Sequence, residues 1–327
     1  MTFQKTILAG AGLAAGLLAG VIVTPASAQS YPSQDVHFIC AFPAGSSSDI
    51  IVRYMAEKMR PLMGRTIVVE NRAGAGGNIA TEYLARSKPD GHTIMLHSAS
   101  AIAANMHLFK KPPIDAGTAI QIAATINRQA FMLAVDASTP HKTLADLTAA
   151  LKQKGTKGSF ATNAGTATVM GALYKQAAGL ETTEVVYKVG SDSMNELKSG
   201  VLDFGIYDPV FSLAQQRAGV FRILGIGINK RLQAAPELPT MEEQGVPNVD
   251  LLGWWSAMVP AGTPKPIVDQ LNKWISQVVE MEETKKFLNG FGSDPWVTTP
   301  EEGQARLKKD IQDWAEYVRV AKIEPQG

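Results

Sequence analysis

The amino-acid sequence predicts an α/β fold of two lobes, each built on a mostly parallel sheet flanked by helices, with a ligand cleft between them. Apolar runs of strand length alternate with helical patterns along the chain, which is typical of parallel sheets covered by helices. Each half of the chain contains a strand that runs into a loop of small residues and then into a helix. The length of 327 residues is also comfortable for two lobes and long for one compact core.

The first 28 residues have the form of a secretory signal peptide. Lys5 is their only charged residue, residues 7–23 are apolar or glycine, and Ala26-Ser27-Ala28 is a typical cleavage triplet. An uncleaved membrane anchor is the weaker alternative, because the stretch is short, rich in glycine and followed at once by this triplet. We therefore expect export, cleavage after Ala28, and a mature chain that begins near Gln29.

The charge and cysteine content exclude several classes of partner. Without Lys5 the chain carries 30 basic and 30 acidic residues, and it has no basic run, which argues against nucleic acid as a partner. Cys40 is the only cysteine, so an exported protein of this sequence has no internal disulfide. We interpret Cys40 as a small buried hydrophobic residue; a reactive thiol is the alternative.

The expected elements follow in order along the chain. In the first half, strands are predicted at residues 36–41, 66–69 and 93–97, and helices at residues 50–63, which Gly64 closes, and 77–86. In the second half, strands are predicted at residues 120–126, 131–135, 158–161, 184–187, 204–207 and 222–228. Helices are predicted at residues 144–152, 169–178 and 193–199, from Pro266 onward, and over residues 301–322. We expect residues 29–125 and 251–327 to form lobe 1 and residues 126–250 to form lobe 2.

The loop after the first strand is the most informative feature of the chain. It reads Phe42-Pro43-Ala44-Gly45-Ser46-Ser47-Ser48-Asp49 and leads directly into a helix. The first N–H groups of a helix lack intrahelical partners and carry partial positive charge, so such a loop can hold an anion without Arg or Lys. A second turn of small residues, Asn163-Ala164-Gly165-Thr166, precedes a helix in the other half and would face the first loop across the cleft.

Three residues at strand ends or helix starts have two interpretations each. Asp49 and Asp208 either stabilise the helices that they precede or contact a ligand in the cleft. His97 ends a strand at the expected cleft, where it is either a ligand contact or a structural histidine.

Enzymatic signatures are hard to find in the sequence. It contains no H-E-x-x-H, C-x-x-C or G-x-S-x-G motif, so neither a zinc site nor a nucleophile elbow is predicted. The run Gly74-Ala75-Gly76-Gly77 lacks the third glycine of a dinucleotide fingerprint and is better explained as a turn into a helix. A serine hydrolase that uses Ser46–Ser48 with His97 stays open as the competing enzyme class; it would require a seryl–imidazole contact.

Several segments in order resemble one family of transport receptors. They are Tyr31-Pro32, the Phe42–Asp49 loop, Val68-Val69-Glu70-Asn71-Arg72-Ala73-Gly74-Ala75-Gly76-Gly77, Pro89-Asp90-Gly91-His92-Thr93, Tyr187-Lys188, Pro239-Thr240-Met241 and Pro260-Ala261-Gly262-Thr263-Pro264. Across the whole mature chain the sequence resembles the solute-binding component of tripartite tricarboxylate transporters, the Bug-type receptors.

The resemblance implies a type II-like periplasmic-binding-protein fold whose lobes close over a small carboxylate and hand it to a membrane permease. The family's ligand-binding positions correspond here to Phe42, Ala44, Gly45, Ser46, Ser47 and Asp49 in the first loop and to His97, Ser98, Ser100 and Ala101 beside it. In the opposing lobe they correspond to Asn163, Ala164, Gly165, Thr166, Thr168 and Asp208. The chain departs from the family pattern at Ser46, Ser47 and His97, where glycine is common. It also departs at the turn after Asn163, which is shorter, and at Tyr187-Lys188-Val189-Gly190.

We therefore expect a non-enzymatic, monomeric periplasmic receptor without metal or cofactor. Main-chain amides and hydroxyls would hold one carboxylate, and Asp49, Asp208 or His97 would contact the distal end of the ligand. A dicarboxylate is favoured. An aromatic carboxylate is second, because Ala99, Ala101, Ala103 and Ala104 could admit a ring, and an amino acid is third. A receptor that signals to a sensor protein is a further alternative.

Overall fold

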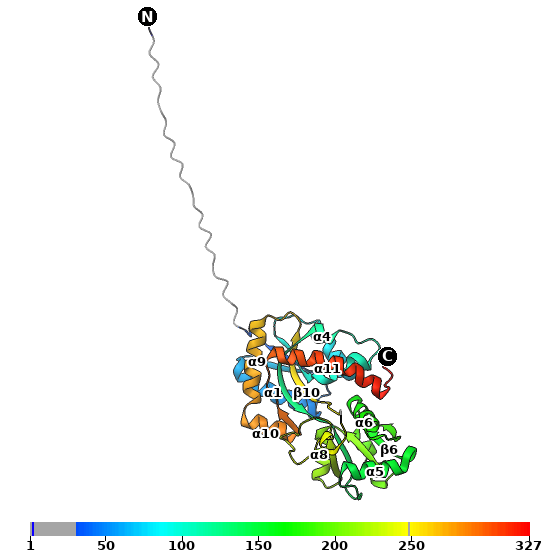
Figure 1. Cartoon of the computed structure of the whole chain (residues 1–327). Helices are drawn as coiled ribbons and strands as arrows, with labels where there is room; N and C mark the ends of the chain where they lie inside the picture. The colour runs from blue at the N-terminus through cyan, green and yellow to red at the C-terminus, as the bar shows by residue number, and fades with distance from the viewer. Residues whose placement is uncertain (1, 3–30, 248) are drawn as a thin grey trace.

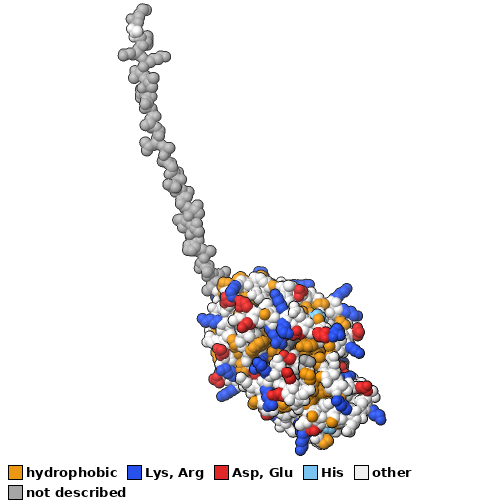
Figure 2. Space-filling model, in the orientation of Figure 1, with side chains coloured by type: hydrophobic (Ala, Val, Ile, Leu, Met, Phe, Trp, Pro, Cys, Tyr) orange, Lys and Arg blue, Asp and Glu red, His pale blue; other side chains and the backbone are white. Residues whose placement is uncertain are grey.

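The computed structural model describes residues 2, 31–247 and 249–327, and its elements form two lobes (Figure 1). Apart from residue 2, the predicted signal peptide lies outside the described residues. No helix in the described part of the chain is long and apolar enough to cross a membrane. On the face seen in Figure 2, Lys and Arg side chains are interspersed with Asp and Glu, and apolar side chains gather near the junction of the lobes.

The first lobe is built on a six-stranded sheet, here called sheet 1, with the order β11-β4-β10-β3-β1-β2. β1 pairs in parallel with both β2 and β3, whereas β10 is antiparallel to β3 and β4, and β11 is antiparallel to β4. The strands are β1 (Val36–Cys40), β2 (Ile67–Asn71), β3 (Thr93–Ser98), β4 (Ile120–Gln129), β10 (Gly253–Pro260) and β11 (Ser293–Pro295).

Helices cover both faces of sheet 1. Strand residues alternate between two cores, because successive side chains of a strand point to opposite faces. Phe38 and Cys40 pack with α1 (Ser47–Met63) and α9 (Lys265–Val279), while Ile39 packs on the opposite face. That opposite face carries α2 (Asn78–Ala85), α3 (Ala99–Leu108) and α11 (Pro300–Ala321). The short helix α4 (Ala116–Ala119) precedes β4, and α10 (Glu282–Gly290) precedes β11.

The second lobe is built on a five-stranded sheet, here called sheet 2, with the order β7-β6-β8-β5-β9. β6 is parallel to β7 and β8, and β5 is antiparallel to β8 and β9. The strands are β5 (Met132–Asp136), β6 (Ser159–Thr162), β7 (Thr183–Val186), β8 (Phe204–Tyr207) and β9 (Phe221–Ile226). The helices are α5 (Leu144–Lys154), α6 (Gly165–Ala178), α7 (Met194–Ser199) and α8 (Pro209–Arg217).

The pairing registers place the carboxyl edges of the two sheets opposite each other. β4 ends at the carboxyl edge of sheet 1, and after two intervening residues β5 begins beside Tyr207, at the carboxyl end of β8. The return path also joins these edges, since β9 ends beside Met132 and β10 begins beside Gln129. α11 packs against both α3 and α6, which adds a shared hydrophobic core between the lobes. The end of α11 near α6 can be followed in Figure 1.

The predicted fold class of two α/β lobes is confirmed, with both sheets mixed. The first α-helix closes at Gly64, whose φ of 60° lies in the left-handed region as expected for a helix-ending glycine. Cys40 is a buried free thiol, as predicted. The sequence interpretation missed β10, which lies at the centre of sheet 1 with all eight residues buried, and it missed α3, α8, α10 and β11.

Candidate functional site

Four helices begin at the facing carboxyl edges of the two sheets. α1 follows β1 and α3 follows β3, and these two strands are neighbours in sheet 1. α6 follows β6 and α8 follows β8, which are neighbours in sheet 2. Ligands of open α/β sheets bind outside the carboxyl ends of the strands, so this junction is the candidate site.

The first loop is held from below by the carboxylate of Asp49, whose side chain is 2% exposed. Its Oδ2 accepts hydrogen bonds from the N–H of Gly45 and from Nε of Arg53, both at 2.8 Å, and its Oδ1 accepts one from Nδ2 of Asn71 at 2.8 Å. Burial alone would raise the pKa of Asp49, but these hydrogen bonds lower it to about 2. Asp49 therefore stays ionised and directs both oxygens into the protein.

The outer side of the same loop keeps donors available. The Oγ of Ser46 accepts the N–H of Asp49 at 3.2 Å and donates to the carbonyl of Pro43 at 2.8 Å, so Ser46 is the N-cap of α1. Ser47 and Ser48 occupy the first two positions of α1, and we find no acceptor for their N–H groups within the described residues. These two amides are the donors that an anion would meet.

The start of α3 lies beside this loop and is capped by Ser98. The Oγ of Ser98 accepts the N–H of Ala101 at 3.2 Å and lies 3.0 Å from the Oγ of Ser100. Ser100 in turn accepts the N–H of Trp254, in β10, at 3.4 Å. The three predicted residues of this segment therefore lie together, with the two hydroxyls linked to each other.

The opposing turn in lobe 2 leads into a helix without a side-chain cap. Ala164 is the N-cap residue of α6, and in the described part of the chain its side chain makes no capping hydrogen bond to the first turn. The Oδ1 of the preceding Asn163 is buried and has no hydrogen-bond partner among the described residues. Gly165 approaches the other lobe closely, since a Cβ there would lie 2.9 Å from Cδ1 of Leu108, in α3. Thr166 follows it in the first turn of α6.

Two predicted residues of lobe 2 are engaged within the protein. The hydroxyl of Thr168 donates to Oε1 of Glu184 at 2.5 Å, as does that of Thr162. Asp208 is the N-cap of α8, where its Oδ1 accepts the N–H of Phe211 at 3.0 Å. Burial raises the pKa of Asp208 despite that hydrogen bond.

His97 lies beneath the first loop in an aromatic cluster. Its ring centroid is 5.0 Å from that of Phe42 and 6.1 Å from that of Trp255, and the residue is 2% exposed. Neither ring nitrogen has a hydrogen-bond partner among the described residues. Burial lowers the pKa of His97 to about 4, so the ring is neutral at pH 7.

This placement changes the expected roles of Asp49, Asp208 and His97. We expected one of them to contact the distal end of the ligand, but Asp49 holds its own loop, Asp208 caps a helix and His97 is covered. Among the described residues His97 makes no hydrogen bond to Ser46, Ser47 or Ser48, so the contact that a serine hydrolase of this design would require is not formed. Within the described residues there is likewise no cluster of three potential metal ligands.

The sequence interpretation missed three residues of the site: Arg53, Asn71 and Glu184. Arg53 could have been found, because Asp49 and Arg53 are four residues apart on one helix and such pairs face each other. Asn71 and Glu184 come from other strands, and their contacts depend on the strand order.

Gly77 is required where it stands because His97 packs on it. Its φ is 95°, and a Cβ would lie 2.4 Å from Nε2 of His97. We expect Gly77→Ala to cost about 2 kcal/mol, from left-handed strain and from displacement of the ring. Gly45 has a similar φ of 81° but no atom within 4 Å of its would-be Cβ, so Gly45→Ala should cost about 1 kcal/mol, from strain alone. Urea unfolding measures both, and equal costs would contradict the packing argument.

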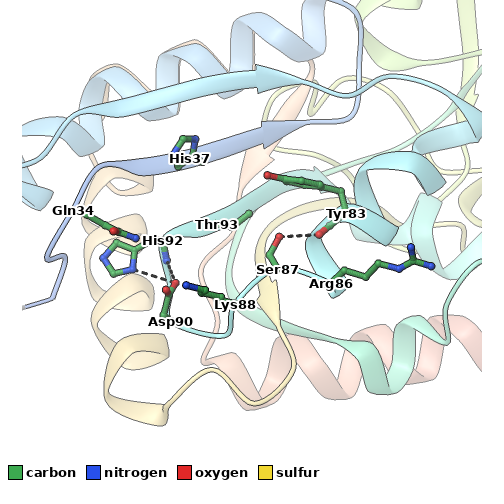
Figure 3. A pocket seen from close by; sticks show the side chains of 9 residues that line it. All are labelled: Gln34, His37, Tyr83, Arg86, Ser87, Lys88, Asp90, His92 and Thr93. Atoms are coloured by element: carbon green, nitrogen blue, oxygen red, sulfur yellow. Dashed lines mark hydrogen bonds and ion pairs between the residues drawn. The ribbon is translucent and has the colours of Figure 1, made fainter.

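A hollow lies at the opposite, amino edge of sheet 1 (Figure 3). There the side chain of Asp90 accepts the N–H of His92, and Nε2 of His92 accepts the N–H of Ser33. This hollow is far along the strands from the helix N-termini, so it is the weaker candidate. Its lining residues are Gln34, His37, Tyr83, Arg86, Ser87, Lys88, Asp90, His92 and Thr93.

Comparisons with known proteins identify the family of the chain. A family model described as the tripartite tricarboxylate transporter family receptor matches residues 51–321. The chain is 30% identical to Protein BugT of Bordetella pertussis over 301 residues, which cover 91% of this chain and 92% of that protein. Among solved structures, R. palustris Rpa4515 with adipate has a TM-score of 0.78 and 27% identity, covering 90% of this chain and 99% of that one. The periplasmic binding protein BugD has a TM-score of 0.74 and 29% identity, covering 90% of this chain and 100% of that one.

Proposed function

Because the chain belongs to the tripartite tricarboxylate transporter family of receptors, we propose that it captures a small organic carboxylate, with a dicarboxylate favoured, and delivers it to a membrane permease. The chain is a periplasmic solute-binding receptor and not an enzyme. The carboxylate, its second charge and the permease are the parts that we propose. The adipate bound by Rpa4515, a dicarboxylate, supports the choice of ligand class.

One observation supports this proposal above all. The N-termini of α1 and α6 lie at facing sheet edges, and each leaves N–H groups that have no side-chain or main-chain partner within residues 31–247 and 249–327. Such groups combine unpaired donors with the positive end of a helix dipole, which favours an ionised carboxylate between them. In this arrangement Ser47, Ser48, Gly165 and Thr166 supply main-chain donors, while Ser98 and Ser100 supply hydroxyls. Phe42, Ala44 and Ala101 line the lobe 1 side.

A thermal-shift screen of carboxylic acids, with native mass spectrometry for an acid that co-purifies, tests the function directly. We expect adipate to raise the melting temperature and its dimethyl ester to leave it unchanged, because the ester cannot accept charge-assisted hydrogen bonds. Stabilisation by none of the linear, aromatic or amino acids in the screen would contradict the proposal. Stabilisation by an aromatic acid alone would replace the dicarboxylate with the second candidate.

Ser47→Pro tests the donor itself. Proline is well tolerated at the first helical position, and Ser46 already has the extended φ and ψ (−70° and 160°) that a residue before proline adopts. The variant should keep α1 and lose one N–H, weakening binding of the stabilising acid about 30-fold, by about 2 kcal/mol. Isothermal titration calorimetry measures this loss.

The matched control is Glu282→Pro, at the first position of α10. There Met281 precedes it with a compatible φ of −61° and ψ of 134°, and the helix start lies beside Lys58, which pairs with Glu283 at 2.9 Å. Affinity should be unchanged in the control. If both variants bound the acid as tightly as the unaltered protein does, the amide of Ser47 would have no part in binding.

We also propose that residues 1–28 are removed on export, and that the lobes built on sheet 1 and sheet 2 move toward each other and close over the solute. N-terminal sequencing of protein from the periplasm should begin at Gln29. Small-angle scattering should give a smaller radius of gyration when the acid is added.

A further inference from the structure

The loop proposed to hold an anion has a negative charge directly beneath it. The buried carboxylate of Asp49 accepts the N–H of Gly45, two residues before the free amide of Ser47. An ionised group at this position would repel a carboxylate bound above the loop, and two negative charges on a solute would be repelled more than one. The site therefore needs a compensating positive charge to accept a dianion.

Arg53 supplies that charge. Its Nε donates to Oδ2 of Asp49 at 2.8 Å, and its Nη2 donates to Oδ1 of Asn71 at 3.0 Å, so the guanidinium is fixed on two sides. Its side chain is half exposed, whereas that of Asp49 is 2% exposed. A guanidinium keeps its charge at every relevant pH and matches such planar partners well.

Other arginines near this edge are committed to their own partners. Arg72 pairs with Glu70 at 2.8 Å and lies 3.6 Å above the ring centroid of Tyr83. Arg128 pairs at 3.1 Å with Asp294, which is itself buried. Among these three, Arg53 is the one whose partner lies beneath the proposed anion loop.

We propose that Arg53 is a specificity-determining residue: by neutralising Asp49, it allows the loop of residues 42–49 to accept solutes with two negative charges. This inference rests on the proposed function of carboxylate capture. Loss of Arg53 leaves the bonds from Gly45 and Asn71 to Asp49 in place, so the shape of the loop is kept while its charge becomes more negative by one. If Arg53 had a purely structural role, its loss would weaken the binding of singly and doubly charged solutes equally.

The test compares adipate with hexanoate, which has the same carbon chain and one carboxylate fewer. In Arg53→Gln we expect the dissociation constant to rise about threefold for hexanoate and about tenfold or more for adipate, because repulsion scales with solute charge. The difference in affinity loss between the two acids should decrease as the salt concentration is raised from about 0.01 M to about 0.3 M, because salt screens the charge of Asp49. Calorimetry measures the dissociation constant of each acid for both proteins at both salt concentrations, and circular dichroism verifies the fold.

Arg86→Gln is the matched control. Arg86 also forms an i,i+4 pair, with Glu82 at 2.6 Å, but it lies beside the hollow at the other edge of sheet 1 (Figure 3). This variant removes the same charge from the same lobe, and the ratio of the two affinities should stay that of the unaltered protein. A second variant, Asp49→Asn combined with Arg53→Gln, removes both charges and should restore that ratio even if both affinities fall.

The outcomes separate this inference from the proposed function. Three results would overturn the role of Arg53 and leave carboxylate capture unaffected. They are an equal loss of affinity for the two acids in Arg53→Gln, no loss of affinity for either acid, and a ratio of affinities that the double variant does not restore. If the unaltered protein bound neither acid, the proposed function would fail for these probes, and the role of Arg53 would fall with it.

Discussion

Trp254→Ala should lower the free energy of unfolding by about 4 kcal/mol, as removal of a fully buried aromatic side chain typically does. Trp254 lies in β10, between β3 and β4, and is 0% exposed. Its Nε1 donates to Oδ2 of Asp310 at 2.6 Å, and the other oxygen of that carboxylate accepts Nε of Arg306 at 2.6 Å. The substitution therefore opens a cavity and also deprives a buried carboxylate of a donor.

Trp274→Ala is the comparison for this prediction. Trp274 is half-buried on α9, where its ring stacks on that of Tyr31 with 6.0 Å between centroids. Less apolar area is lost there, so the cost should be less than half of that for Trp254→Ala. Urea unfolding followed by circular dichroism measures both variants. Equal costs would mean that β10 is not the central strand of the lobe 1 core.

Acid should destabilise the protein through His97 in a defined pH window. The unfolded chain binds a proton on this histidine below its ordinary pKa of 6.5, whereas the folded protein does so only below about 4. Stability is therefore complete above pH 6.5 and is lost as the pH falls toward 4, by a total of about 3 kcal/mol. Asp49, with its lowered pKa of about 2, acts only in the more acidic window below its ordinary value of 3.8.

His97→Phe should abolish this dependence, because phenylalanine fills similar space between Phe42 and Trp255 and cannot be protonated. The measurement is urea unfolding of both proteins at several pH values between 7.5 and 4. The difference between the two curves isolates His97, since all other titrating groups are shared. Parallel curves would show that His97 is not buried as a neutral ring.

Much of the fold could be predicted because local chemistry and tertiary packing agree. The first loop and the helix after it are an example: a strand, small residues, an N-cap serine and a closing glycine all specify the same unit. β10 could not be predicted in the same way. Its residues are buried on both faces, so they show no alternation, and Pro260 made its end resemble a turn. Its place between β3 and β4 is decided by pairing partners more than a hundred residues away.

In the candidate site, too, some features follow from local sequence and others depend on tertiary contacts. The amides of the first loop follow from local sequence, because every helix start leaves such groups unpaired. The directions in which the side chains of Asp49, Thr168 and Asp208 point do not follow from local sequence. Each could have faced the cleft or a neighbouring donor or acceptor within the protein. Asn71 orients Asp49 and Glu184 orients Thr168 through hydrogen bonds, and both partners come from strands that the chain order alone does not place nearby.

The position of β10 near the C-terminal end of the sequence constrains the order in which the protein can fold. Residues 132–226 hold all five strands of sheet 2, so that lobe can gather its own contacts from one continuous stretch. Sheet 1 stays in two pieces, β2-β1-β3 and β4, until residues 253–260 are inserted between them. Because pairings distant in sequence form slowly, a nascent or newly exported chain would expose the edges of β3 and β4 that β10 later pairs, until its last quarter is available.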